Sequence, residues 1–218
     1  MSYLSASTHQ EIIADPSKVE TYYVQLWKRF ATDLGSADYG LVLGASILPV
    51  AFAAIVAWDL KPYGPEKGVT LPEILASPSI ACDNYVRLAW YLTGFMPQVS
   101  WVPAKIVALG WNGGAVGNHA QMLVSDGTNS LLIDPTIGLV VRGVTFDTLM
   151  QGKPVSPTMM ATFESFNVYA GSSGTFTQTV KNAVLQGKYK PSDLLYYVKS
   201  LDQFTHMPAN AYWLTPQA

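Results

Sequence analysis

The chain has very little charge. Asp, Glu, Lys and Arg together make up 13% of its 218 residues, about half of the roughly 25% that is usual. The formal net charge is −2 and there is no run of Lys or Arg, which argues against a nucleic-acid partner. Hydrophobic residues make up 49% of the chain. So little charge can hardly cover the surface, and an oligomer, a large partner or a membrane would account for the deficit.

Cysteine is nearly absent as well. Cys82 is the single cysteine, so no disulfide can form within the chain. This fits a reducing compartment, and we expect a cytoplasmic protein. Residues 1–10 lack the apolar core of a secretory signal. With one cysteine and three scattered histidines the sequence has no metal-ligand spacing, and we expect neither a metal nor a cofactor.

One long stretch, residues 39–58, has no charged residue and is long enough to span a bilayer. Pro49 in its middle disfavours a continuous membrane helix. The stretch is therefore either a membrane anchor or two short elements buried in a core or an interface. Residues 61–68 form a loop by composition. We predict a helical extension over 1–60, either part of the same unit or a membrane or interface segment, and a second part over 61–218.

Expectations for local structure at the two ends follow from the same patterns. Residues 1–14 are expected to be a loose start. A helix is predicted over 16–34, because Asp15 can cap it and apolar residues follow at helical spacing. Asp59 is expected to be a solvated charge at the end of an apolar stretch. Near the C-terminus a helix is predicted over 192–200.

The segment around Cys82 predicts a buried helix. Ser79 can cap it, and the residues after Cys82 are apolar on most sides of a helical wheel. Asp83 and Arg87 lie four residues apart and can pair. A thiol in the first turn is favoured as a thiolate by the helix N-terminus, whereas a carboxylate at Asp83 works against this ionisation.

Two strand-like runs flank Asp126 and Gly127, which is a strong hairpin signal. If these two residues form the whole turn, His119 lies directly across from Asp134, close enough for a carboxylate to accept the imidazole N–H. The alternate positions of both strands are apolar and should pack on the core. They are Ala120, Met122, Val124, Leu131 and Ile133.

Cys82, His119 and Asp134 are therefore the candidate catalytic residues. In this order a thiol at a helix start, an imidazole on a strand and a carboxylate on the next strand can serve as nucleophile, base and orienting group. Taken singly, a buried cysteine is more often a small hydrophobe, and a lone histidine on a strand more often plays a structural role.

The sequence resembles the transglutaminase-like superfamily of cysteine enzymes, a branch of the papain-like folds. Three short segments carry the resemblance: 82–85 opening a helix, 118–120 opening a strand, and 134–136 closing the next strand. Gln121 stands where the family usually has an aromatic residue. The resemblance implies an α+β fold in which an antiparallel sheet packs on a central helix that bears the nucleophile. It makes residues 61–218 a catalytic domain.

The same resemblance gives Cys82 the role of nucleophile, His119 that of base and Asp134 that of orienting carboxylate. It implies an upstream oxyanion donor, for which Trp58 and Tyr63 are candidates. We expect hydrolysis of an amide or ester, as by a peptidase or amidase, on a protein, peptide or small amide substrate. The alternatives are acyl transfer to an amine, of the transglutaminase or arylamine N-acetyltransferase type, and a non-catalytic structural or binding subunit.

Overall fold

The computed structural model describes residues 4–26, 48–64, 68, 70–96, 105–112, 118–125, 130–151, 153, 160–162 and 194–197. Within these ranges the chain has helices and one antiparallel sheet, which is the mixed α+β class that the sequence predicts. The six strands of this sheet lie in the order β5-β4-β3-β2-β1-β6. They are β1 (Lys105–Asn112), β2 (Asn118–Ser125), β3 (Ser130–Asp134), β4 (Leu139–Arg142), β5 (Met160–Thr162) and β6 (Leu194–Tyr197).

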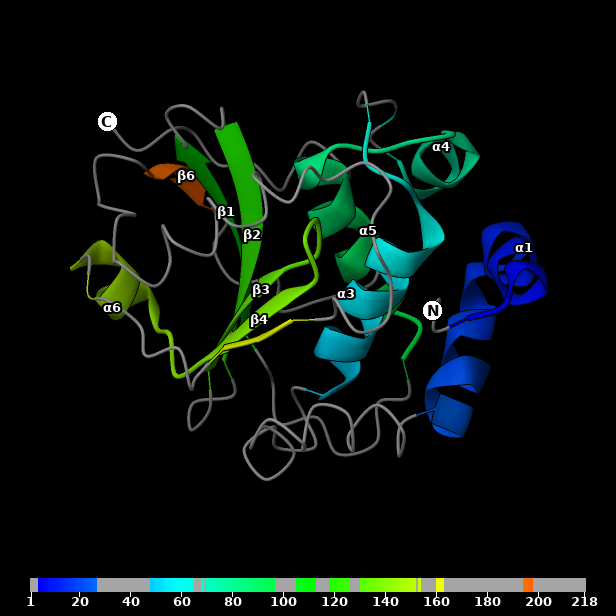
Figure 1. The fold of residues 1–218 in the computed structure, drawn as a ribbon, viewed down its shortest axis with the longest axis horizontal. Coiled ribbons are helices and arrows are strands. Elements are labelled where there is room, and N and C mark those ends of the chain that lie inside the picture. Colours follow the sequence, from blue (N-terminus) through cyan, green and yellow to red (C-terminus); the bar gives the residue numbers. More distant parts are fainter. Residues whose placement is uncertain are drawn as a thin grey trace.

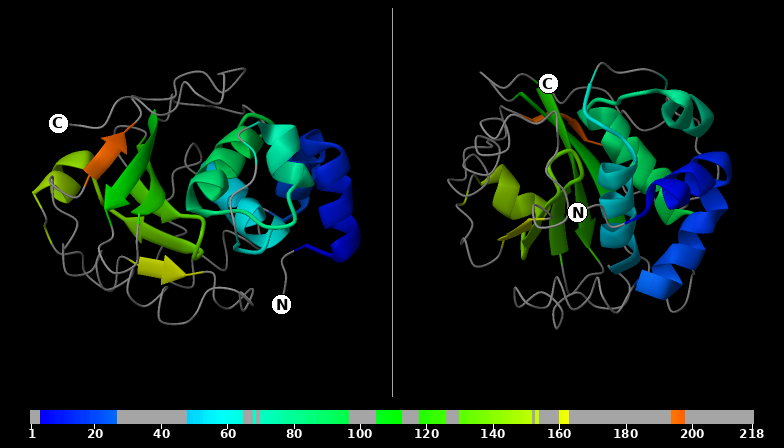
Figure 2. Two further views of the ribbon diagram at one scale, coloured as in Figure 1. Left: turned by 90° about the horizontal axis from the view of Figure 1, so that it is seen from above. Right: turned by 45° about the vertical axis from the view of Figure 1, so that its right-hand side comes forward.

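The helices form layers on the two sides of this sheet (Figure 1). Helices α3 (Leu48–Leu60) and α5 (Cys82–Thr93) lie against one face, and α1 (Ala6–Ala14) lies outside them. Helix α6 (Phe146–Met150) lies on the opposite side of the sheet, as the views in Figure 2 also show. The remaining helices are short: a 3-10 turn, η1 (Pro16–Lys18), and α4 (Leu71–Ala76).

The uncharged stretch 39–58 contributes to the core through α3. Residues 39–47 lie outside the described ranges, whereas the side chains of 49–58 are buried. Helix α3 is apolar all round, which is typical of a helix enclosed by protein. Pro49 lies in the first turn of α3, where a proline costs no helical hydrogen bond. No helix in the described ranges is long and apolar enough to cross a membrane.

A single hydrophobic core joins the N-terminal helices, α3, α5 and one face of the sheet. Leu4, Ile12 and Val19 belong to it, together with the buried residues of α3 and α5. The sheet contributes the alternate apolar positions predicted from the sequence: Ala120, Met122, Val124, Leu131 and Ile133. The described parts of 1–60 and of 61–218 therefore share one core. The division of the chain at residue 60 stays a prediction.

The loose start predicted over 1–14 is wrong, because residues 6–14 form α1. Ser5 caps this helix, and its hydroxyl accepts a hydrogen bond from the backbone N–H of Thr8 at 3.2 Å. In the segment 16–34, Asp15 caps η1 by accepting from the N–H of Ser17 at 3.1 Å. The chain continues as a helix over 19–26, and residues 27–34 lie outside the described ranges.

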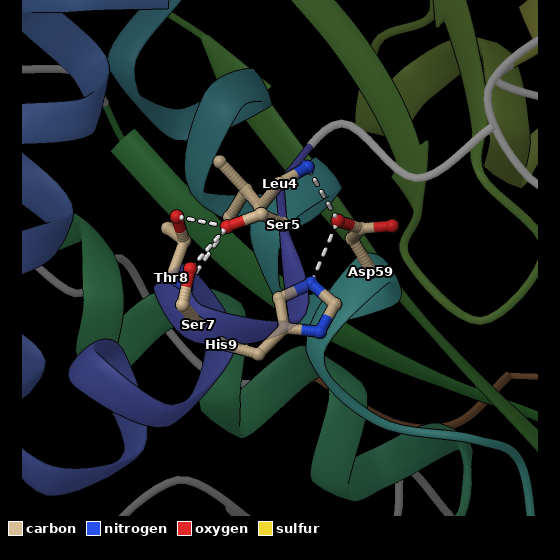
Figure 3. Close-up of polar contacts among 6 residues, drawn as sticks. All are labelled: Leu4, Ser5, Ser7, Thr8, His9 and Asp59. Carbon is tan, nitrogen blue, oxygen red and sulfur yellow. Dashed lines mark hydrogen bonds and ion pairs between the residues drawn. The ribbon is translucent and has the colours of Figure 1, made fainter.

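Asp59 is a buried anchor between α1 and α3, so its prediction as a solvated charge is wrong (Figure 3). Its Oδ2 accepts from the backbone N–H of Leu4 at 3.1 Å and lies 2.9 Å from Nε2 of His9. A buried carboxylate needs such partners to offset its desolvation. Sequence spacing could not reveal them, because they lie 50 and 55 residues away along the chain.

The helix predicted over 192–200 is also wrong at its centre. Leu194–Tyr197 form β6, which pairs antiparallel with β1 at the edge of the sheet. Aromatic and apolar residues fit a pleated, half-buried surface well. Pairing with β1 therefore outweighs the helical spacing of this segment.

Candidate active site

Cys82 is the first residue of α5. The helix has Ala81 as its N-cap and Gly94 as its C-cap, so Ser79 does not cap it and that prediction is wrong. Ala81 has only a methyl side chain, which cannot accept a hydrogen bond, and no side chain caps the first turn. The first helical backbone bond runs from Tyr85 N–H to Ala81 O. The amide groups of the first turn, including that of Cys82, therefore have no intrahelical partner and give this end a partial positive charge.

The predicted ion pair between Asp83 and Arg87 is present. Arg87 Nε lies 3.9 Å from Asp83 Oδ2, and the Arg87 side chain is buried. Opposite charge at this range partly offsets the negative potential that Asp83 would otherwise impose on the neighbouring thiol. The charge of Asp83 is thus partly balanced beside the start of α5.

A short loop passes beside the residues that precede Cys82. Gly64 N–H donates to Ile80 O, and Ile80 N–H donates to Pro62 O, each at 3.1 Å. This bridge sets Tyr63 alongside Ile80, two residues before the cysteine. Burial raises the pKa of Tyr63, and the charges of Cys82 and Asp83 raise it further. Tyr63 therefore lies within electrostatic reach of the thiol.

Lys61 fixes the start of this loop. Its ammonium donates to Leu75 O at 2.5 Å and to Ser77 O at 2.8 Å, and its own carbonyl accepts from the hydroxyl of Tyr85 at 2.5 Å. Burial lowers the pKa of Lys61. These bonds tie the end of α3 to α4 and α5. Trp58, the other candidate oxyanion donor, is buried within α3 as part of the hydrophobic core.

The β2–β3 hairpin has a different register from the predicted one. Ser125 pairs with Ser130, so residues 126–129 separate the strands instead of 126 and 127 alone. The observed pairing ends at Met122 with Ile133, and one further step places Gln121, not His119, opposite Asp134. Because side chains alternate with a period of two, a shift by two residues keeps His119 on the same face as Asp134. The predicted contact is therefore diagonal.

His119 and Asp134 are bonded across this diagonal. Nε2 of His119 lies 2.5 Å from Oδ2 of Asp134, and both side chains have no exposed surface. The same oxygen accepts from Nε2 of Gln121 at 3.0 Å, and Oδ1 accepts from the backbone N–H of Thr136 at 3.1 Å. The carboxylate is thus held at both oxygens. A carboxylate only accepts, so Nε2 of His119 carries the proton.

The imidazole of His119 also interacts with Cys82. Burial alone lowers the pKa of His119, but the charge and hydrogen bond of Asp134 outweigh it, and a hydrogen bond and charge from Cys82 add to them. The net effect raises the pKa from its usual 6.5 to about 10. Since Nε2 meets Asp134, Nδ1 is the ring nitrogen left for the thiol. The arrangement can transfer a proton between sulfur and imidazole while Asp134 stabilises the imidazolium.

The structure thus brings the three predicted residues together. Gln121 was missed as a partner of Asp134, although its position two residues after His119 places both on one face of β2. Asn84 was missed too; its buried Nδ2 donates to Gly68 O at 3.1 Å and ties the helix start to the loop before α4. In the described part of the chain, no three residues among His, Cys, Asp and Glu gather to hold a metal ion.

Comparison with protein families, with curated proteins and with solved structures gives no match for this chain. The geometry around Cys82, His119 and Asp134 is therefore what indicates a function.

Proposed function

We propose that this protein performs cysteine-dependent acyl chemistry on an amide or ester, with hydrolysis as its reaction, in a fold of the papain-like, transglutaminase-like type. The observation that carries the proposal is the buried imidazole of His119, which is bonded to Asp134 and interacts with Cys82. The chain order supports it too: a helix that begins at the cysteine precedes a strand with the histidine and a strand with the aspartate.

The first half of the reaction forms an acyl-enzyme. Sγ of Cys82, as a thiolate, attacks the carbonyl carbon of the substrate, and the charge moves to the carbonyl oxygen. The amide groups of the first turn of α5 are suited to stabilise this oxyanion. When the tetrahedral intermediate collapses, the bond to the leaving nitrogen or oxygen breaks. The imidazolium of His119 gives its proton to that leaving group.

The second half releases the acyl group. His119, now neutral, takes a proton from water, and the resulting hydroxide attacks the thioester carbon. The carbon–sulfur bond breaks, the carboxylic acid leaves and Cys82 returns to the thiolate beside a protonated His119. An amine in place of water would complete an acyl transfer by the same steps. The two reactions share one acyl-enzyme and differ in the second nucleophile.

Asp134 has an orienting role in both halves. Its Oδ2 holds Nε2–H of His119, which leaves the other ring nitrogen for the thiol and the leaving group. Because the pair is buried, water does not weaken this bond. The negative charge also favours the imidazolium that forms when the thiol ionises.

The test is a search for a Cys82 acyl-enzyme with p-nitrophenyl esters and a panel of peptide amides, followed by intact-protein mass spectrometry and steady-state turnover. We expect an acyl adduct on the native protein, none on Cys82→Ala, and turnover in His119→Ala reduced by at least about 100-fold. Added hydroxylamine should release the acyl group as a hydroxamate. If Cys82→Ala and the native protein react alike with every probe, the proposal is wrong and a non-catalytic subunit becomes the better interpretation.

A further inference from the structure

We propose that Gln121 is a positioning residue of this site: its amide N–H holds the carboxylate of Asp134 so that Oδ2 meets Nε2 of His119. The inference builds on the proposed function and assigns a role to a residue outside the three candidate catalytic groups. Gln121 is fully buried, so it cannot contact a substrate from this position without rearrangement. Its effect on the chemistry would act through Asp134.

The position of Gln121 in the hairpin makes this contact possible. Continued by one step, the register of β2 and β3 puts Gln121 directly opposite Asp134, and side chains of opposed residues on one face lie within hydrogen-bond reach. His119 is two residues away on the same face and reaches Asp134 along the diagonal. The carboxylate therefore needs a second constraint to keep Oδ2 turned toward the more distant imidazole.

Three donors fix the orientation of the Asp134 carboxylate. Thr136 N–H binds Oδ1, while Gln121 and His119 share Oδ2. Because the carboxylate cannot donate, the amide of Gln121 must present its nitrogen here and not its oxygen. With Gln121 removed, Oδ2 would be held by His119 alone, and only the N–H of Thr136 at Oδ1 would still oppose rotation of the carboxylate.

The other end of the Gln121 amide shows that packing alone does not explain this residue. Oε1 is buried and accepts no hydrogen bond from any residue that the structure describes. A buried acceptor without a donor is unfavourable for folding. An apolar side chain of similar size would avoid this cost, so the glutamine is best explained by what its N–H does for Asp134.

Two variants separate positioning from packing. Gln121→Met keeps the volume and removes the donor. Gln121→Glu keeps the shape and carries a donor only while it is protonated. A buried carboxyl beside the carboxylate of Asp134 holds its proton to a higher pH than usual, because two negative charges at this range repel each other. The titratable groups that meet Asp134 in the described structure are His119 on β2 and, through it, Cys82 at the start of α5.

The experiment measures the rate of Cys82 alkylation by iodoacetamide from pH 5.5 to 10 in the full chain. We expect Gln121→Met to react at least about tenfold more slowly than the native protein near pH 6.5, since small displacements of a catalytic group have effects of this size. Gln121→Glu should stay within about threefold of the native rate at pH 6 and fall behind as the carboxyl ionises. Leu123→Met, two residues on and on the same face, is the packing control and should follow the native profile.

The outcomes distinguish this inference from the proposed function. If Cys82 in His119→Ala is alkylated as fast as in the native protein at every pH, the proposed function itself fails. If His119→Ala is slow but Gln121→Met matches the native profile, only the role of Gln121 is wrong. A slowing that is the same at every pH in both Gln121 variants would mean a merely structural residue and would also overturn the inference. Should Gln121→Met not fold, the pH-dependent loss in Gln121→Glu decides the question.

Discussion

Nε2 of His119 lies 2.5 Å from Oδ2 of Asp134, and neither side chain has exposed surface. An ion pair sealed from water is strong, but it leaves an uncompensated charge if one partner is lost. Both the stability of the fold and the reactivity of Cys82 should therefore depend on whether His119 is protonated. Three of the predictions below follow from this dependence.

The first prediction concerns the pH profile of Cys82 alkylation. Because the pKa of His119 is raised to about 10, the imidazolium persists through neutral pH and stabilises a thiolate beside it. We expect the native protein to be alkylated at pH 6.5 at least about tenfold faster than His119→Ala. The two rates should converge above pH 9, since an ordinary thiol has a pKa of about 8.5 and is then ionised without help from His119. Parallel profiles for both proteins would contradict a thiolate–imidazolium pair.

Asp134→Asn tests the orienting carboxylate. Asparagine keeps the shape but removes the charge, and the donors from His119 and Gln121 then meet an amide that can donate as well as accept. In a serine protease triad the equivalent change lowers turnover by about 10⁴-fold, because the histidine takes the wrong tautomer. We expect a loss of about 10³-fold or more in turnover of the best amide or ester probe, with the variant still folded by circular dichroism.

Thr136→Ser is the matched control for Asp134→Asn. It keeps the backbone N–H that binds Oδ1 of Asp134, and it should retain turnover within a few-fold of native. Similar losses in the two variants would indicate that the turn, and not the charge of the carboxylate, matters for the reaction.

The pKa of His119 also makes the stability of the fold depend on pH. The pKa is raised from about 6.5 in the unfolded chain to about 10 in the folded one. The contribution of protonated His119 to the free energy of unfolding is therefore fully present below about pH 6.5 and is lost as the pH rises toward 10. We expect the urea midpoint of the native protein to fall between pH 7 and pH 10. His119→Gln cannot titrate at this position, so its urea midpoint should fall less over the same pH range. If the midpoints of the two proteins fall equally with pH, the predicted role of His119 is wrong.

The contact between His119 and Asp134 was predicted from the sequence, whereas the register of the hairpin that carries it was not. Alternation of apolar and polar residues identifies the faces of β2 and β3, and a face depends only on whether positions are odd or even. The register depends on the connection between the strands, and the observed pairing begins at Ser125 with Ser130. Because the error was two residues, His119 and Asp134 stayed on one face and still meet. A register shift of one residue would have placed the two side chains on opposite faces of the sheet.

The misses away from the site have a common physical cause. Ser5 followed by Ile12 and Ile13 is a capped, partly apolar helix, but its short length gives a weak signal, and its stability comes from packing of Ile12 in the core. Asp59 is buried, against the prediction, because its partners Leu4 and His9 lie far away in the sequence. β6 forms where the spacing of apolar residues predicts a helix, because β1 offers an edge for pairing. Local patterns do not contain these tertiary contacts.

Asp59→Ala tests the anchor between α1 and α3. The change leaves the buried N–H of Leu4 without the carboxylate and removes the bond to His9. Loss of one partner in a buried charged pair costs roughly 2–4 kcal/mol of unfolding free energy. Asp15→Ala removes an exposed carboxylate at the cap of η1 and should cost clearly less. Equal urea midpoints for the two variants would show that Asp59 contributes no more than a surface cap.

Gly64→Ala tests whether the loop beside the helix start supports the site. A Cβ at Gly64 would lie 2.3 Å from Oγ and 2.5 Å from Cβ of Ser79, so the loop with Tyr63 must move away from Ile80. We expect a loss of about 1–3 kcal/mol in unfolding free energy, as for other overpacked positions. Ser79→Gly removes both clashing atoms and leaves the nearest contact, Ser79 Cα, at 3.9 Å.

The double variant Gly64→Ala with Ser79→Gly should therefore regain stability relative to Gly64→Ala, after allowance for the cost of Ser79→Gly alone. The measurement is a double-mutant cycle of urea unfolding, with Cys82 alkylation at pH 6.5 followed in the same four proteins. If the loop supports the site, reactivity should fall in Gly64→Ala and recover in the double variant. The alternative outcome is that stability falls in Gly64→Ala and recovers in the double variant, while the alkylation rate of Cys82 is the same in all four proteins. Displacement of the loop would then have no effect on the thiol, and Tyr63 and its loop would have no role in the reaction.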